Sequence, residues 1–143
     1  MDELCVRQSP SLWLWVAVSR LVGQVLGFAF GPRDRDTLAL CWQDVPADYV
    51  DKPVVTDGLE TYQSFFNPEQ HRSVLKGSGE TSIVESLNTK WRQRQSGLVR
   101  RSCGVSRRIE TDLVERFFLL VEQHNRYSAL RWARQQKTTH SDQ

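Results

Sequence analysis

The amino-terminal third of the chain alternates short apolar segments with polar turns, a pattern that predicts a sheet. Residues 2–6 are a short strand-like segment, and the segments 13–18 and 23–30 are rich in β-branched and aromatic residues. Only four residues separate the second and third segments, so these two predict a hairpin. Gly31-Pro32 ends the third segment. We therefore expect a three-stranded meander.

A helical period follows the meander. Apolar positions at helical spacing predict a helix over 34–44, and Pro46 ends it. KPVVT at 52–56 predicts a short strand of the fully buried kind. A helical turn over 59–66 and a weaker strand over 71–75 come next. The order of elements is that of an α/β chain.

The helix between the meander and the strand at 52–56 is long enough to serve as a crossover. Such a crossover lays the strand that ends before Asp57 parallel to an existing strand. If that neighbour is the first strand, Asp2 and Asp57 lie close together. Taken alone, Asp57-Gly58 favours a turn, because Asp bonds its own backbone and Gly tolerates positive φ. The topology adds a second interpretation, a carboxylate placed at a strand end, where ligands gather in open α/β sheets.

Two helices complete the pattern. The apolar stripe of the first contains Ile83, Val84, Leu87, Trp91 and Leu98. The second is expected to begin near Ser106, and its stripe contains Ile109, Leu113, Phe117, Leu120 and Val121. From Gln135 onward the chain is polar, and we expect this tail to fray.

Composition is that of one globular domain. A chain of 143 residues is long enough to bury a core. Its three cysteines are far apart and have no zinc-ligand spacing, which indicates neither a disulfide framework nor a structural metal. The longest apolar run, residues 12–18, is too short to cross a membrane. The chain opens with acidic residues rather than a basic leader, so we expect a cytoplasmic protein without membrane contact.

Charge is unevenly distributed along the chain. Residues 1–85 carry 7 basic and 12 acidic side chains, a balance of −5, whereas residues 86–143 carry 12 and 5, a balance of +7. No acidic residue occurs between Ser86 and Ile109. A run of charges is commonly a solvated helix face, but such faces usually mix signs. A run of one sign favours a polyphosphate partner, and we expect nucleic-acid contact there.

Glu85 is the third candidate carboxylate. Glu85, Asn88 and Arg92 are spaced at i, i+3 and i+7, so they share one border of the first helix's apolar stripe. Taken alone, Glu85 is more typical of a solvent-exposed helix residue. A carboxylate on that border can also face inward toward a metal while the helix stays packed.

Several of these segments together resemble the insertion-sequence-one family of DDE transposases. The run IVESLNTKWRQRQSGLVRRS at 83–102 resembles the family's segment around its third acidic residue. DEL at 2–4 resembles the first catalytic motif, and TDG at 56–58 with Tyr62 resembles the second. HNRY at 124–127 is similar to the His/Asn-bearing final helix, although His124 alone is more commonly a satisfied helix-border side chain.

The resemblance implies a ribonuclease-H-like fold, in which a mixed sheet of the meander and parallel strands is flanked by helices. Asp2, Asp57 and Glu85 would be the catalytic residues and would bind two Mg²⁺ ions, with Mn²⁺ able to substitute. The implied activity is metal-dependent cleavage of DNA strands and their transfer during insertion-sequence transposition. The implied partners are transposon ends and target DNA, with a homo-oligomer on paired ends and a nucleoid-associated location.

The same resemblance places DNA-contacting residues on the basic segment. They are Asn88, Lys90, Arg92, Arg94, Arg100, Arg101, Arg107 and Arg108.

The family's zinc-binding and helix-turn-helix region has no counterpart in this sequence. We therefore expect a catalytic domain over 1–134 with a shortened first strand and without its DNA-reading part, followed by a polar tail over 135–143. Whether such an isolated chain is active stays open. Two alternatives also stay open: a nuclease on the same fold, and a non-catalytic or regulatory DNA-binding fragment of a transposase.

Overall fold

The computed structural model of the chain describes residues 1–8, 11–75, 77–101 and 108–141. Its strands are β1 (Asp2–Gln8), β2 (Ser11–Val18), β3 (Val25–Gly31), β4 (Val54–Thr56) and β5 (His71–Ser73). Its helices are α1 (Arg35–Gln43), α2 (Ala47–Val50), α3 (Glu60–Phe65), α4 (Ser82–Arg101) and α5 (Arg108–Ser141). The predicted α/β class is confirmed, and the four-residue helix α2 is the element that the sequence pattern did not predict.

The meander is present as predicted. β1, β2 and β3 form an antiparallel sheet in that order, with Asp2 opposite Val16 and Leu4 opposite Leu14. β2 is the central strand, and its Leu14 and Val16 are fully buried. A continuous apolar run suits this strand because both of its faces are covered.

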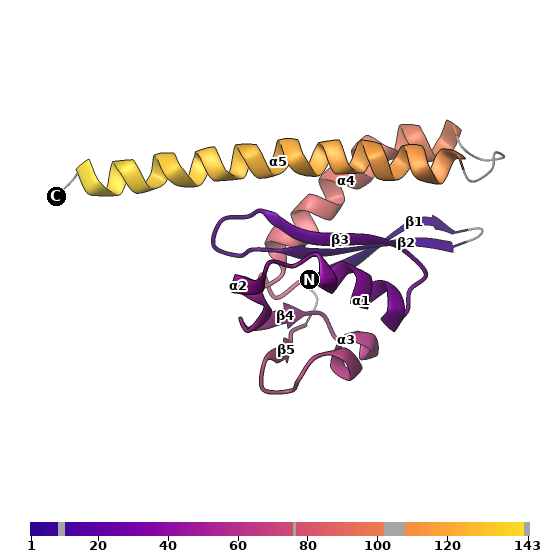
Figure 1. Cartoon of the computed structure of the whole chain (residues 1–143), viewed down its shortest axis with the longest axis horizontal. Helices are drawn as coiled ribbons and strands as arrows, with labels where there is room; N and C mark the ends of the chain where they lie inside the picture. Colours follow the sequence, from indigo (N-terminus) through magenta and orange to yellow (C-terminus); the bar gives the residue numbers. More distant parts are fainter. Residues whose placement is uncertain (9–10, 76, 102–107, 142–143) are drawn as a thin grey trace.

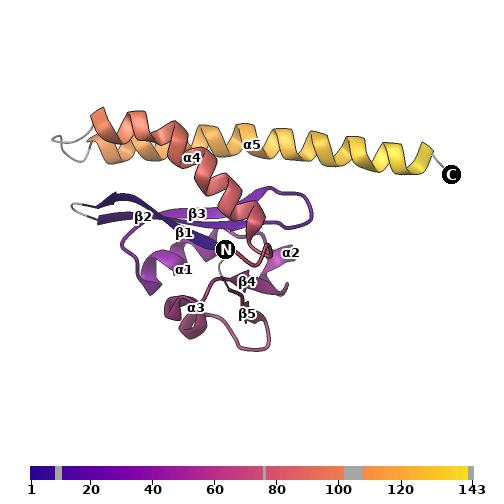
Figure 2. The same cartoon turned by 180° about the vertical axis from the view of Figure 1, so that it is seen from behind.

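Helices cover the two faces of this sheet differently (Figures 1 and 2). On one face, Trp15 packs in a core with Leu38 of α1 and Tyr62 of α3. On the other face, α4 and α5 lie across the sheet, and their Trp91 and Phe117 are buried against it. The alternation of side chains along β2 divides its large residues between the two cores.

β4 and β5 form a separate two-stranded parallel sheet rather than part of one mixed sheet. This differs from our expectation, and a ribonuclease-H-like fold is therefore not established by the strand order. β1 and β4 do not pair as strands, and the hydrogen bond that joins them comes from Met1, just before β1, whose nitrogen donates to the Val55 carbonyl oxygen at 2.8 Å. That single bond still lays the start of β1 beside β4.

The final helix α5 is longer than its apolar stripe predicts. The expected fraying from Gln135 onward was wrong, because the described helix continues to Ser141. The division of the chain into a domain over 1–134 and a polar tail stays a prediction. Gln and Lys favour helices, which is a physical reason for the continuation of α5. The Thr138 and Thr139 hydroxyls are satisfied by the carbonyl oxygens four residues earlier. The expected start near Ser106 lies outside the described residues.

One turn of α5 fastens the helix to the hairpin between β2 and β3. The Asn125 side chain exchanges two hydrogen bonds with the Val25 backbone, at 2.7 and 2.9 Å. His124 Nε2 donates to the Gly23 carbonyl oxygen at 2.8 Å. His124 is therefore a side chain with a hydrogen-bond partner, as the sequence alone favoured.

Within the residues of known placement, no helix is both long and apolar enough to cross a membrane.

Candidate functional site

Three carboxylates meet where the two sheets touch. Asp2 and Glu3 begin β1, Asp57 directly follows β4, and one oxygen of each lies within 4.8 Å of the others. All three residues are half-buried. The Met1–Val55 hydrogen bond explains this meeting, because it holds the start of one strand beside the end of the other. We call Asp2, Glu3 and Asp57 the acidic cluster.

Asp57 is both a turn residue and a member of the cluster. Its Oδ1 accepts a hydrogen bond from the Leu59 backbone N–H at 3.1 Å, the contact that an Asp makes in a turn before a helix. The Thr56 hydroxyl donates to the Asp57 carbonyl oxygen at 2.8 Å. These bonds fix the orientation of Asp57, so the two interpretations left open by the sequence are compatible.

Asn88 connects α4 to the cluster. Its Nδ2 donates to Asp2 Oδ2 at 2.8 Å, and the residue is only 5% exposed. The structure therefore places Asn88 against a carboxylate rather than on an open surface. Its Oδ1 is buried and accepts no hydrogen bond within the described residues, which leaves one oxygen of this site without a donor.

Glu3 was not predicted as a site residue. Its side chain is 3% exposed, and its two carboxylate oxygens accept from Arg33 and from the Tyr62 hydroxyl, each at 2.7 Å. The Arg33 guanidinium in turn lies 4.4 Å from the ring centroid of Trp13. Glu3 lies opposite the core residue Trp15 in the register of β1 and β2, so it shares that buried face, where a carboxylate needs partners. The sequence pattern does not give this register.

Crowding and burial change the acidity of the cluster. Burial raises the pKa of Asp2 from its ordinary 3.8 to about 6, and the nearby negative charge of Glu3 acts in the same direction. The hydrogen bond from Asn88 partly opposes both effects. Burial, and then the negative charge of Glu3, raise the pKa of Tyr62, so this hydroxyl stays a donor. Carboxylates held this close favour either a proton or a bound cation.

Glu85 lies outside the acidic cluster. Its Oε1 accepts a hydrogen bond from the Thr81 hydroxyl at 2.6 Å, and the residue is half-buried. It precedes Asn88 by three positions on α4, so the two share one border of the helix. The structure brings together Asp2, Asp57 and Asn88 of the predicted site, and it does not bring Glu85 into contact with them.

The predicted DNA-contacting side chains are only partly described. Lys90 is exposed on α4. The backbone of α4 carries Arg92, Arg94, Arg100 and Arg101, and Arg108 is the first residue of α5, but the side chains of all five lie outside the described part. Arg107 lies outside the described residues altogether. These assignments therefore stay predictions.

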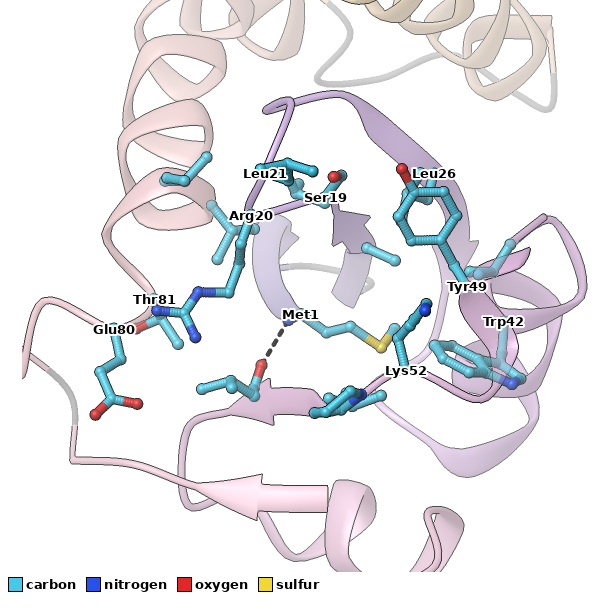
Figure 3. Close-up of a pocket in the computed structure, with 18 residues that line it drawn as sticks. Met1, Ser19, Arg20, Leu21, Leu26, Trp42, Tyr49, Lys52, Glu80 and Thr81 are labelled. Atoms are coloured by element: carbon cyan, nitrogen blue, oxygen red, sulfur yellow. Dashed lines mark hydrogen bonds between the residues drawn. The ribbon is translucent and has the colours of Figure 1, made fainter. Parts of the chain in front are cut away.

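A cavity of about 290 Å³ lies between the β2–β3 turn, β4 and the start of α4 (Figure 3). Its lining mixes the apolar Met1 and Trp42 with the charged Arg20, Lys52 and Glu80. No member of the acidic cluster lines it. We therefore treat the cluster, and not this cavity, as the candidate site.

Hard carboxylate oxygens gathered at strand ends of an α/β chain define a candidate divalent-metal site, the kind that serves phosphoryl-transfer enzymes. The chain belongs to the IS1 transposase family, because the family model for IS1 transposase matches residues 4–125. No curated protein and no solved structure matches the chain. Membership implies a transposase role in general, and with it DNA binding and DNA cleavage and transfer. Asp2 and Glu3 stand just before the matched residues.

Proposed function

We propose that this chain is the catalytic domain of a DDE transposase, with a ribonuclease-H-like active site that cleaves and joins DNA strands. The observation that carries the proposal is the meeting of Asp2 and Asp57. They are 55 positions apart, on different sheets, yet their carboxylates lie within 4.8 Å. The family match supports the same conclusion from an independent direction.

The donor set fits a divalent cation. Mg²⁺ prefers hard oxygen ligands and retains several waters, so a few carboxylates suffice to hold it. The buried Asn88 Oδ1, which lacks a hydrogen-bond donor, supplies a further oxygen at the same place. Asp2 and Asp57 would hold two Mg²⁺ ions, or Mn²⁺ in their place. When bound, such ions stabilise the negative charge that develops on phosphate oxygens during attack on a phosphodiester.

Glu85 is our third proposed ligand. Its place three residues before Asn88 puts it on the helix border that meets the site. In the state described here it bonds to Thr81, so it would have to exchange that hydroxyl for the metal. The Thr81 hydrogen bond would then fix the orientation of the Glu85 carboxylate until a metal ion binds.

The remaining residues of the site orient these carboxylates. Asn88 fixes one oxygen of Asp2, and the Leu59 N–H fixes one oxygen of Asp57. Arg33 and Tyr62 bind both oxygens of Glu3, which limits its repulsion of Asp2 and makes it a positioning residue rather than a free ligand.

DNA is the proposed substrate, both as transposon ends and as target. The basic residues from Lys90 to Arg108 would position phosphates beside the acidic cluster, since phosphate contacts orient a duplex without reading its sequence. Asn88, which we expected among the DNA contacts, is buried and donates to Asp2, so we assign it to the metal site instead. Paired ends would be held by a homo-oligomer.

A strand-cleavage and strand-joining assay tests the proposal. Wild-type chain is incubated with a labelled terminal-repeat duplex, a target plasmid and Mg²⁺ or Mn²⁺. We expect cleavage and joined products, and loss of both in Asp57→Asn, which keeps the turn contact to Leu59 because Asn also accepts there. The matched control is Asp51→Asn, at an exposed aspartate away from the cluster.

Each alternative predicts a different result in this assay. Cleavage without joined products would indicate a nuclease on the same fold. DNA binding without any cleavage in either metal would indicate a non-catalytic fragment. Full activity in Asp57→Asn would remove the acidic cluster from the mechanism.

A further inference from the structure

Helix α5 changes its charge at its middle. Residues 108–122 carry four acidic and two basic side chains. From Gln123 to Ser141 there is no acidic residue, whereas Arg126, Arg131, Arg134 and Lys137 are basic. A solvated helix usually mixes charges of both signs, so a one-signed stretch of about five turns favours a polyanionic partner.

The same part of α5 leaves the body of the protein. The helix is fastened to the β2–β3 hairpin at His124, Asn125 and Ser128, and beyond this point it projects away from the sheet in both views (Figures 1 and 2). Every residue from Leu130 to Thr139 is exposed. We call residues 126–141 the basic arm.

Stabilisation of the helix end does not account for these charges. Basic side chains interact favourably with the carbonyl end of a helix, but that effect falls off within the last turn. Arg126 and Arg131 lie roughly three to four turns before Ser141, given 3.6 residues per turn. Their charges therefore need another explanation.

A second copy of the chain fits the arm poorly. A paired helix needs apolar residues that recur along one seam. The large exposed apolar residues of the arm are Tyr127, Leu130 and Trp132. Tyr127 and Leu130 share one face, but Trp132 lies nearly opposite Leu130, and no large apolar residue continues the seam from 133 to 141. Two arms would also bring like charges together.

We propose that the basic arm binds the phosphates of duplex DNA without reading sequence. A helix about 10–12 Å across matches the roughly 12 Å width of the major groove, and Arg126 to Lys137 span about 16 Å of the helix axis. Projection from the body lets a duplex lie along the arm without meeting the sheet. This inference rests on the proposed function only in taking DNA as the partner.

The test is a titration of a 30-base-pair duplex of arbitrary sequence at several salt concentrations, with EDTA present so that the metal site plays no part. The variant is Arg126→Gln/Arg131→Gln/Arg134→Gln. Gln favours helices nearly as well as Arg, and circular dichroism checks that the helix remains. The matched control is Arg20→Gln/Arg35→Gln/Lys52→Gln, which removes the same charge from exposed positions on the body.

The release of counterions from DNA determines how large an effect the arm substitutions should have on binding. Each lost phosphate contact reduces the slope of the plot of log K against log salt by about 0.9. The arm variant should therefore lose up to about 2.7 in slope, and more than about tenfold in affinity at low salt. The control should stay near wild type. Arg126→Lys/Arg131→Lys/Arg134→Lys should bind like wild type, because phosphate contacts require charge and not a specific head group.

Several results would overturn the proposal. One is an arm variant whose slope equals that of the control, and another is a folded Lys variant that binds as weakly as the Gln variant. If the triple Gln variant loses helix content, Arg131→Gln/Arg134→Gln tests the same point with an expected loss of about 1.8 in slope. If the wild-type chain fails to cleave DNA in the strand-joining assay while the arm variant still loses DNA affinity in this titration, the proposed function is wrong and the proposal for the basic arm stands.

Discussion

The acidic cluster and the basic arm differ in how their charges are held. The cluster gathers Asp2, Glu3 and Asp57 from two sheets. Asp2 and Glu3 accept hydrogen bonds from distant residues, and Asp57 accepts one from the backbone of its own turn. The arm displays arginines along a single helix, and its position follows from the packing of the earlier part of that helix and from its anchor around Asn125. The cluster is thus a product of tertiary structure, whereas the arm is a product of local helix formation.

This difference indicates a separation of tasks. Chemistry on a phosphodiester needs ligands placed to within a fraction of an ångström, which requires a supported and partly buried site. Holding a polyanion needs only charge that the partner can reach. Changes at the cluster should therefore affect cleavage, metal binding and stability, and changes at the arm should affect DNA affinity and its salt dependence.

The largest expected effect is at Asp2. Asp2→Asn should reduce metal-dependent cleavage on the order of a thousandfold or more, because it removes a charged oxygen from the metal site while it keeps the shape of the side chain. DNA affinity measured with EDTA should stay unchanged. A parallel loss of DNA affinity would show that the cluster and the arm are not separate in function.

Substitution of Glu85 tests whether this residue belongs to the metal site. If it is a metal ligand, Glu85→Gln should weaken Mg²⁺ binding by about 10–100-fold, the range typical of altered metal-site residues. Most of the rise in melting temperature that Mg²⁺ produces should then be lost. Glu115→Gln, at an exposed position on α5, is the matched control. An unchanged response to Mg²⁺ would restrict the site to the residues that already meet.

Tyr62 tests how much the fold depends on the cluster. Tyr62→Phe removes the hydroxyl that donates to Glu3 at a fully buried position, and we expect a loss of about 1.5–3 kcal/mol in the free energy of unfolding by urea. Tyr127→Phe, on the arm and 65% exposed, should change it by less than about 0.5 kcal/mol. Equal effects of the two substitutions would contradict a structural role for the Glu3 contact.

The two regions should also respond differently to pH. A metal must displace the proton of Asp2, whose pKa of about 6 lies above its ordinary value, so Mg²⁺ affinity should fall about tenfold per pH unit below pH 6. The arginines of the arm stay charged, so titration of those side chains should not change DNA binding between pH 5 and 8. A Mg²⁺ affinity that is flat from pH 5 to 7 would argue against Asp2 as a ligand.

In the absence of metal, the raised pKa of Asp2 makes the fold less stable as the pH rises, whereas a rise in pH strengthens Mg²⁺ binding. Between pH 4 and 6 the folded protein retains a proton that the unfolded chain has released, so this group stabilises the fold at low pH and loses that contribution as the pH rises through 6. The difference in unfolding free energy between wild type and Asp2→Asn, measured across this range, isolates the effect.

The sequence predicted the parts of the site that depend on topology and missed those that depend on side-chain packing. A crossover after the meander was enough to expect Asp2 near Asp57. Glu3 was not predicted because neighbouring residues of a strand normally point to opposite faces of the sheet. At the start of β1, however, the carboxylates of both Asp2 and Glu3 approach Asp57. The contact of Asn88 with Asp2 depends on how α4 lies across the sheet, which helical periodicity does not specify.

The fold shows the same division. The spacing of apolar residues along the sequence predicted the meander, α1 and α4, because each of these buries a continuous face. It did not predict that β4 pairs with β5 alone, since strand partners are set by long-range packing. It also underestimated α5, in which residues 130–139 are exposed and the helix propensity of residues such as Gln135 and Lys137 favours its continuation.

Direct titration with Mn²⁺, followed by the electron paramagnetic resonance signal of the free ion, tests the central claim that Asp2 and Asp57 form a metal site. At pH 7.5 we expect wild-type chain to bind Mn²⁺, Mg²⁺ to compete for it, and Asp57→Asn to lose the binding while Asp51→Asn retains it. If wild type binds no more Mn²⁺ than Asp57→Asn does, the acidic cluster is not a metal site and the proposed mechanism is wrong.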